Sequence, residues 1–127
     1  LPLTQDGNMP QVFEQNAESL VGRENVGHVQ HRTGSTDMGD ISQIMPAIHP
    51  YVGGATGLGH GSDYVVQDYK LAVITAAKAL AATAVDLLGD GAAKGGEIVG
   101  GHRPNMTRAE YLAFMRGQAK EETFEDN

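Results

Sequence analysis

The sequence VQDYKLAVITAAKALAATAVDLLG, residues 66–89, predicts the longest helix of the chain, and the fold class follows from it. Its apolar residues recur at helical spacing. They form one stripe along the helix, namely Val73, Ala77, Leu80, Ala84 and Leu88. Ile74, Ala81 and Val85 widen this stripe. A helix this rich in alanine and this apolar is expected to press against a flat, close surface, a sheet rather than water.

A second helix is expected near the start of the chain, over roughly residues 9–21. Asn8 followed by Pro10 has the pattern of an N-cap and an early helical proline, and Gly22 is suited to the position just after the helix. Apolar residues recur at helical spacing between these limits. The interval therefore predicts an amphipathic helix.

Further elements are expected between the two helices and after them. Alternating β-branched residues predict a short strand over 26–32, which carries His28 and His31. A short helix is expected near 38–44, followed by an extended run over 47–52. The glycine-rich segment 89–101 predicts a linker, and Thr107 with Glu110 spells the capping box of a final helix. This order predicts an α/β fold, but two or three short strands are too few for a stable sheet.

Length and composition restrict the classes of function. A chain of 127 residues is the size of one domain. Its net charge of −7, with scattered basic residues, argues against nucleic acid as a partner. We find no apolar run long enough to cross a bilayer and no secretion signal, so no membrane partner is expected. The absence of cysteine fits a cytoplasmic protein.

The glycine stretch 53–61 contains His60 between two glycines. Its spacing matches neither G-x-G-x-x-G nor a P-loop, which argues against a phosphate site. The glycines indicate a backbone that turns sharply or passes close to something. His60 follows an extended run, at the kind of sheet end where α/β proteins bind ligands, so both a plain loop residue and a zinc ligand remain open. Ser35, Thr36 and Asp37 likewise fit either a helix cap or an active-site loop.

Three runs in order carry a family resemblance: GSTDMGDISQIMPAIHPYVGG at 34–54, GLGHGSDY at 57–64 and AVITAAKALAATAVDLL at 72–88. Together they resemble the end of the catalytic domain in the aminoacylase/carboxypeptidase family of zinc amidohydrolases. The likeness is greatest to its aminobenzoyl-glutamate hydrolase-like and carnosine-dipeptidase-like branches. The opening residues 1–22 resemble the point where the family chain re-enters the catalytic domain after its inserted lid domain.

The resemblance implies a fold and an organisation. The fold is α/β, a partial sheet with covering helices that forms the C-terminal portion of a phosphorylase/hydrolase-like zinc peptidase catalytic domain. Residues 1–127 would be one C-terminal fragment, with a family-like core over 1–88 and a linker and terminal helix over 89–127. The chain begins Leu1-Pro2-Leu3 without an initiator methionine, which agrees with this expectation.

The resemblance also implies a chemistry. Family members cleave the amide bond of acyl-amino acids, dipeptides or aminobenzoyl-glutamate with a metal-bound water. Two ions are expected in the full-length enzyme, zinc or another divalent metal such as manganese or cobalt. His60 falls on the last metal ligand, and His49 would approach the substrate. The active-site lining would consist of Gly34, Ser35, Thr36 and Asp37. No catalytic residue is expected in this chain, because the glutamate base and the other ligands would precede Leu1.

Two positions depart from the family pattern. Gly61 follows His60 where the family commonly has Ser or Thr, which puts the hydrogen bonding of the loop in doubt, and Asp40 stands where Asn is frequent. The chain alone is expected to be inactive, because a catalytic zinc needs about three protein ligands. Self-association through exposed apolar surface is also expected. The alternative is a binding or assembly module, derived from such an enzyme, that works without metal.

Overall fold

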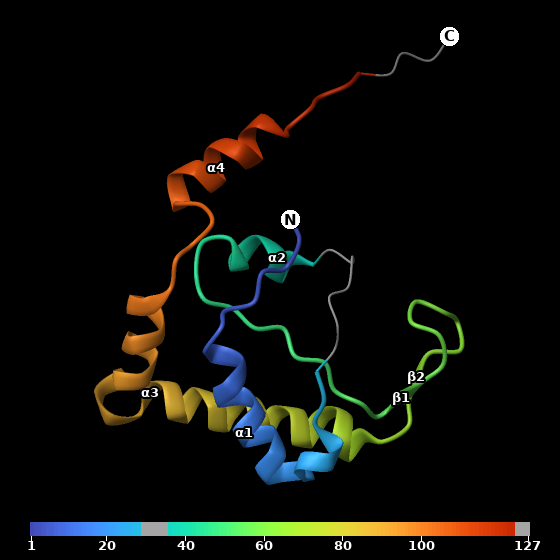
Figure 1. Ribbon diagram of the computed structural model, residues 1–127. Coiled ribbons are helices and arrows are strands. Elements are labelled where there is room, and N and C mark those ends of the chain that lie inside the picture. Colours follow the sequence, from blue (N-terminus) through green and yellow to red (C-terminus); the bar gives the residue numbers. More distant parts are fainter. Residues whose placement is uncertain (29–35, 124–127) are drawn as a thin grey trace.

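The chain forms a mostly helical structure with one small sheet. The computed structural model describes residues 1–28 and 36–123. The elements in order are α1 (Met9–Val21), the 3₁₀ turn η1 (Arg23–Asn25), α2 (Asp37–Ser42), β1 (Ala55–Thr56), β2 (Val65–Val66), the π-helical segment η2 (Lys70–Thr75), α3 (Ala76–Gly101) and α4 (Arg108–Gly117). In Figure 1, α1 lies against the first half of α3, and α4 projects from the rest.

The only sheet in the described part of the chain is an antiparallel hairpin of two-residue strands, in which Ala55 pairs with Val66 and Thr56 with Val65. A sheet that a long helix could cover needs more strands than these. The α/β fold class therefore stays a prediction. The strand expected over 26–32 is wrong for Val26, Gly27 and His28, which form no ladder, and its remaining residues lie outside the described ranges. The extended run 47–52 also pairs with no strand.

Helix α1 has the bounds that the sequence predicts, but a different residue caps it. The side chain of Asn8 makes no capping hydrogen bond. Instead, Oδ1 of Asp6 accepts hydrogen bonds from the backbone N–H groups of Asn8 at 2.8 Å and Met9 at 2.9 Å. A carboxylate here neutralises donors that a helix N-terminus leaves free. The chain bends at Gly7 and Asn8, between Asp6 and the helix.

The same carboxylate connects the start of α1 to distant parts of the chain. Its Oδ2 lies 3.1 Å from Nδ1 of His102, the residue that ends α3, and the side chains of Asp6 and His102 are only 6% and 14% exposed. The backbone N–H of Asp6 donates to the carbonyl of Ala47 at 3.3 Å. Burial alone would raise the pKa of Asp6, but the N–H groups of Met9 and Asn8 and the ring of His102 outweigh it and lower the pKa.

The contact between α1 and α3 is built on small and polar residues of α3. Ala79 and Thr83 are buried there. From α1, the amide nitrogen of Asn16 donates to Oδ2 of Asp86 at 2.7 Å and lies 3.5 Å from Oγ1 of Thr83. Small side chains let the two helix backbones approach closely, and Val12 of α1 is buried as well. The covered face of α3 is thus the one that carries Ala79 and Thr83.

The predicted apolar stripe of the long helix lies on a different face, and it is exposed. Val73, Leu80 and Leu88 are 51%, 54% and 71% exposed. Lys70–Gly101 has the length and composition of a membrane-spanning helix, contrary to the expectation that no apolar run is long enough. Only 11% of its most apolar window is buried. A helix that is apolar on several sides normally has cover on several sides. The expectation that the chain has no membrane partner stays a prediction.

The predicted linker 89–101 is wrong for its second half. Gly89 leaves the helical conformation, and Asp90, Gly91 and Ala92 have φ values of 48°, 68° and 63°. After this break the helix resumes up to Gly101 and runs in a new direction (Figure 1). Its glycines disfavour a helix by themselves. The fold overrides them, because Ile98 is buried, 4% exposed, and His102 pairs with Asp6.

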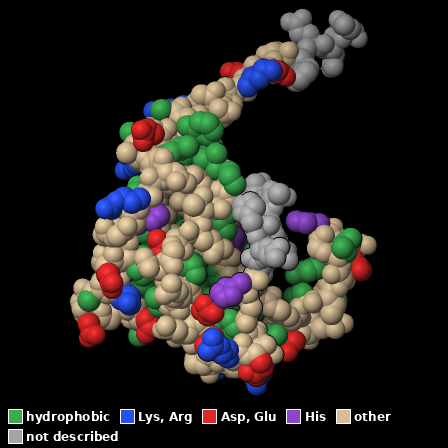
Figure 2. Space-filling model, in the orientation of Figure 1, with side chains coloured by type: hydrophobic (Ala, Val, Ile, Leu, Met, Phe, Trp, Pro, Cys, Tyr) green, Lys and Arg blue, Asp and Glu red, His purple; other side chains and the backbone are tan. Residues whose placement is uncertain are grey.

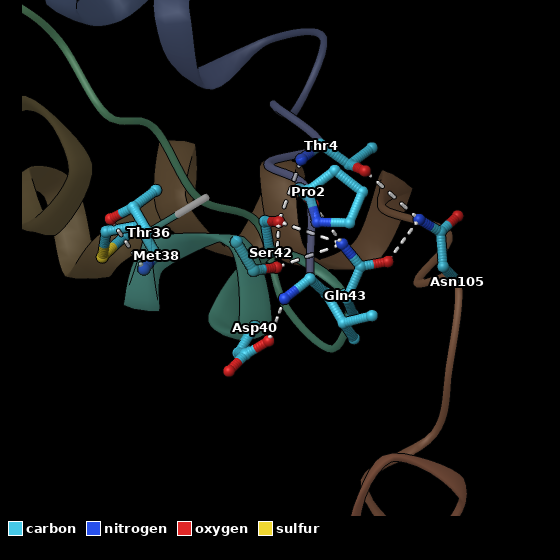
Figure 3. A network of polar contacts seen from close by, with 10 residues as sticks. Pro2, Thr4, Thr36, Met38, Asp40, Ser42, Gln43 and Asn105 are labelled. Atoms are coloured by element: carbon cyan, nitrogen blue, oxygen red, sulfur yellow. Dashed lines mark hydrogen bonds and ion pairs between the residues drawn. The ribbon is translucent and has the colours of Figure 1, made fainter. Parts of the chain in front are cut away.

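A polar network fastens α2 to the start of the chain and to the segment between α3 and α4 (Figure 3). Ser42 and Gln43 are 1% and 5% exposed. The amide nitrogen of Gln43 donates to the carbonyls of Pro2 at 2.8 Å and Gly39 at 3.1 Å, while its Oε1 accepts from Asn105 at 3.0 Å. Both the amide nitrogen and the amide oxygen of Gln43 therefore have hydrogen-bond partners, which burial of a polar group requires.

Helix α4 begins as the sequence predicts. Thr107 and Glu110 form both hydrogen bonds of the capping box. Burial together with the nearby Asp40 charge of α2 raises the pKa of Tyr111. Figure 2 shows hydrophobic side chains gathered over α4, where Leu112, Phe114 and Met115 are exposed by between 38% and 39%.

Replacement of Asp6 by Ala should lower the free energy of unfolding by about 2 kcal/mol, because it removes a helix cap and a buried partner of His102. Urea denaturation of Asp6→Ala against Gln5→Ala, an exposed neighbour, measures the loss. The lowered pKa of Asp6 adds a pH dependence. Its stabilisation is present above the ordinary pKa of 3.8 and is lost as pH falls from there through the lowered folded value. An Asp6→Ala variant with the parental pH profile below that value would contradict this.

Replacement of Gln43 by Glu tests the buried network. The change is isosteric, but it sets a carboxylate oxygen against the carbonyls of Pro2 and Gly39, so we expect a loss of about 3 kcal/mol or more in the free energy of unfolding. Gln5→Glu makes the same chemical change at an exposed site and should cost under about 0.5 kcal/mol. Equal losses in the two variants, measured by urea denaturation, would show that the Gln43 amide is not buried in solution.

Candidate functional site

His60 lies at the tip of the loop that joins β1 to β2, residues 57–64 (the tip loop). The hairpin projects at the side of the molecule beyond the start of α3 (Figure 1). The backbone N–H of Gly61 donates to the carbonyl of Leu58 at 2.7 Å, which closes a four-residue turn with His60 in the third position. The exposed imidazole is therefore held on a short, hydrogen-bonded turn.

The backbone of His60 has φ of 66°, a left-handed conformation that residues other than glycine seldom adopt. A turn with positive φ in its third position favours Gly or Asn there. The chain instead has glycine on both sides of His60 and histidine at the strained position. Strain of this kind is concentrated at functional sites, so the observation favours a role for the imidazole over a plain loop residue.

The expected close approach of the glycines is confirmed at two positions of this hairpin. Gly54 has φ of 102°, and a Cβ there would lie 2.7 Å from the carbonyl oxygen of Asp68. Gly57 has φ of 89°, and a Cβ there would collide with the carbonyl oxygen of Asp63. The hairpin backbone thus passes close to its own other strand and to the residues just before η2.

Thr36 and Asp37 form the start of α2. Oγ1 of Thr36 accepts a hydrogen bond from the N–H of Met38 at 3.4 Å, so Thr36 is the N-cap of α2. Asp37 is the first helical residue, and it is exposed. Ser35, like Gly34, lies outside the described residues. The sequence left two roles open for this motif, a helix cap and an active-site loop. The hydrogen bond of Thr36 supports the helix cap.

His49 lies in the segment between α2 and β1. Its ring stacks on Tyr51, with centroids 5.2 Å apart and planes at 26°. Its Nδ1 is buried and has no hydrogen-bond partner within the described ranges. A buried nitrogen without a partner is costly, which makes His49 a candidate for contact with a further group. The role in substrate binding stays a prediction.

The described residues do not assemble the predicted site residues into one centre. The tip loop and α2 lie apart in Figure 1. Among residues 1–28 and 36–123, no three His, Asp or Glu side chains stand close enough together to hold a metal ion. A two-metal centre therefore does not fit the described residues by themselves, and we derive no catalytic step through one.

Sequence reasoning missed two features near the candidate residues. One is the buried pair of Asp6 and His102, whose imidazole Nε2 is buried and unpartnered in the part of the chain that the structure describes. These residues are 96 positions apart, so no local pattern links them. The other is Asp63, which contacts both arms of the tip loop. Gly57 and Gly61 were the available signal for the position of Asp63, since glycines mark places where another group approaches the backbone closely.

Comparison with known proteins gives one informative match. The human protein Xaa-Arg dipeptidase is 39% identical to this chain over 61 residues, which cover 44% of this chain and 14% of the dipeptidase. Over that stretch the chain is related to a peptidase. No family model matches the chain. No solved structure matches it either. The chain thus spans a small part of the length of this relative.

Replacement of His60 by Gly should not lower the stability of the chain. Glycine adopts positive φ without the penalty of about 1 kcal/mol that a residue with a Cβ incurs, so the free energy of unfolding should stay level or rise by up to about that amount. His60→Val should lower it, because a β-branched residue is least tolerated there. Urea denaturation compares the variants. A clear loss in His60→Gly would mean that the imidazole itself stabilises the fold.

Proposed function

We propose that this chain is the C-terminal part of the catalytic domain of a metal-dependent amidohydrolase or peptidase. Its substrates would be acyl-amino acids, dipeptides or aminobenzoyl-glutamate, cleaved at the amide bond. The observation that carries the proposal is the match to a dipeptidase, which the exposed, strained position of His60 supports. The dipeptidase is far longer than the matched stretch, so the remainder of the active site would come from segments outside this chain.

Within this proposal His60 supplies one ligand to the metal, zinc or another divalent ion such as manganese or cobalt. An exposed imidazole on a projecting turn is free to reach a centre that other segments build, and neutral imidazole is a common zinc ligand. The second ring nitrogen would need a carboxylate or carbonyl partner to fix its tautomer. The other ligands and the glutamate that activates water belong to those further segments.

The uncovered face of α3 supports an incomplete domain. α1 covers the face with Ala79 and Thr83, while the face with Val73, Leu80 and Leu88 stays exposed. Apolar residues repeated along one helix face are stabilised when another surface removes them from water, at about 25 cal/mol per Å². In the proposed enzyme this surface is the remainder of the catalytic domain. In the isolated chain it would promote the self-association that the sequence predicts.

The longer protein that contains this chain should bind metal and hydrolyse at least one member of a panel of acyl-amino acids and dipeptides, whereas the chain alone should do neither. In the longer protein, His60→Asn should lower activity by more than about 100-fold, since even loss of an outer-shell partner costs about 10 to 100-fold. Asn tolerates positive φ, so the turn is retained. Metal analysis and product assays provide the measurement.

His28→Asn is the matched control, because His28 is an exposed histidine that pairs with Glu14 instead. It should leave activity and metal content unchanged. Hydrolysis by the 127-residue chain with bound zinc would refute the proposal that it is an incomplete part. A longer protein that neither binds metal nor hydrolyses any of the panel would favour the non-catalytic binding or assembly module.

A further inference from the structure

Asp63 touches both arms of the tip loop. Its Oδ1 accepts a hydrogen bond from the backbone N–H of Leu58 at 3.4 Å, across the loop from it. The next residue, Tyr64, donates its N–H to the carbonyl of Gly61 at 3.2 Å. Asp63 lies in the arm that leads out of His60, and its carboxylate reaches back to the arm that leads into it.

Two of the loop glycines make room for this aspartate. A Cβ at Gly57 would collide with the carbonyl oxygen of Asp63, and a Cβ at Gly61 would collide with its Oδ1. At Gly61 the Cβ would also lie 2.8 Å from the carbonyl oxygen of Leu58. Gly59 differs, because no described atom lies within 4 Å of a Cβ built there. The loop is thus packed around Asp63 and open at Gly59.

The turn that carries His60 needs such a support. A non-glycine residue at φ of 66° persists only where its surroundings over-determine the conformation. The hydrogen bond from Gly61 to Leu58 closes the turn, and the bond from Leu58 to Asp63 fixes the residue at which the turn begins. Gly61 stands where the resemblance led us to doubt the hydrogen bonding of the loop. In this chain its N–H closes the turn, and its missing Cβ lets Asp63 approach.

We propose that Asp63 is a positioning residue, which holds the tip loop in the conformation that presents the His60 imidazole. It does so through the loop backbone, before any ligand arrives. Its importance for catalysis rests on the proposed function of His60 as a metal ligand. Its effect on the conformation of His60 does not rest on that proposed function. The positioning role and the proposed function can therefore fail separately.

The test uses the 127-residue chain and NMR spectroscopy. A residue at positive φ gives a strong NOE between its own N–H and Hα, and this signal reports the conformation of His60. Asp63→Ala should abolish the strong NOE at His60, whereas Asp63→Asn should keep it, because the amide oxygen can still accept from Leu58. Gly61→Ala should abolish it too, and Gly59→Ala, the matched control, should leave it unchanged.

The loop is exposed, so urea denaturation should show all four variants folded, with the free energy of unfolding lowered by no more than about 1 kcal/mol. A lost NOE then reports the loop and not the fold. A strong NOE at His60 that persists in Asp63→Ala would overturn the positioning role. In the longer protein, Asp63→Ala should reduce retained zinc and Asp63→Asn should retain it. If the NOE results hold but His60→Asn leaves hydrolysis intact, the positioning role stands and the proposed function fails.

Discussion

The buried carboxylate of Asp6 is the interaction on which the arrangement of the helices depends. One oxygen of the carboxylate caps α1, and the other pairs with His102 at the end of α3. The backbone N–H of Asp6 donates to the carbonyl of Ala47, in the segment before the hairpin. A buried charge is tolerated only when it has such partners. In the second half of α3, the pair acts together with the buried side chain of Ile98.

The rest of the interior is sparse, and that bears on function. Among the described residues, as many polar side chains are buried as apolar ones, namely Asp6, Ser42, Gln43 and Thr83 against Val12, Ala47, Ala79 and Ile98. Directional hydrogen bonds, rather than a large apolar core, therefore specify how α2 meets the start of the chain and the segment between α3 and α4. The most apolar surface is on the outside of α3, where it can join a larger domain. An apolar helix face without cover is what the proposed incomplete domain would have.

The tip loop has the opposite character, since it is exposed but internally ordered. Its glycines let the backbone fold around Asp63, and its histidine occupies the position that glycine would occupy at less cost. A chain that only needed a connection between two short strands could use an Asn-Gly turn. In the proposed function, His60 is the residue through which the chain would take part in hydrolysis.

The sequence by itself determined the features that depend on neighbours along the chain. The bounds of α1, the capping box of Thr107 and Glu110, and the sharp turns at the loop glycines all follow from local hydrogen bonding and local sterics. His60 could also be singled out from sequence, through its position among glycines and the family resemblance. Its φ and the packing of Asp63 could not, because they depend on how the two arms of the loop meet.

Only the tertiary structure decided the features that join distant residues. Asp6 replaced Asn8 as the cap of α1 because His102, 96 positions away, helps to hold its carboxylate. The second half of the glycine-rich segment 89–101 became helical because Ile98 is buried, which outweighs a poor local propensity. The helix face covered by α1 carries small residues and not the most apolar stripe, since close packing with Asn16 selects for size and hydrogen bonding. Contacts of this kind have no local period, so no pattern in the sequence predicts them.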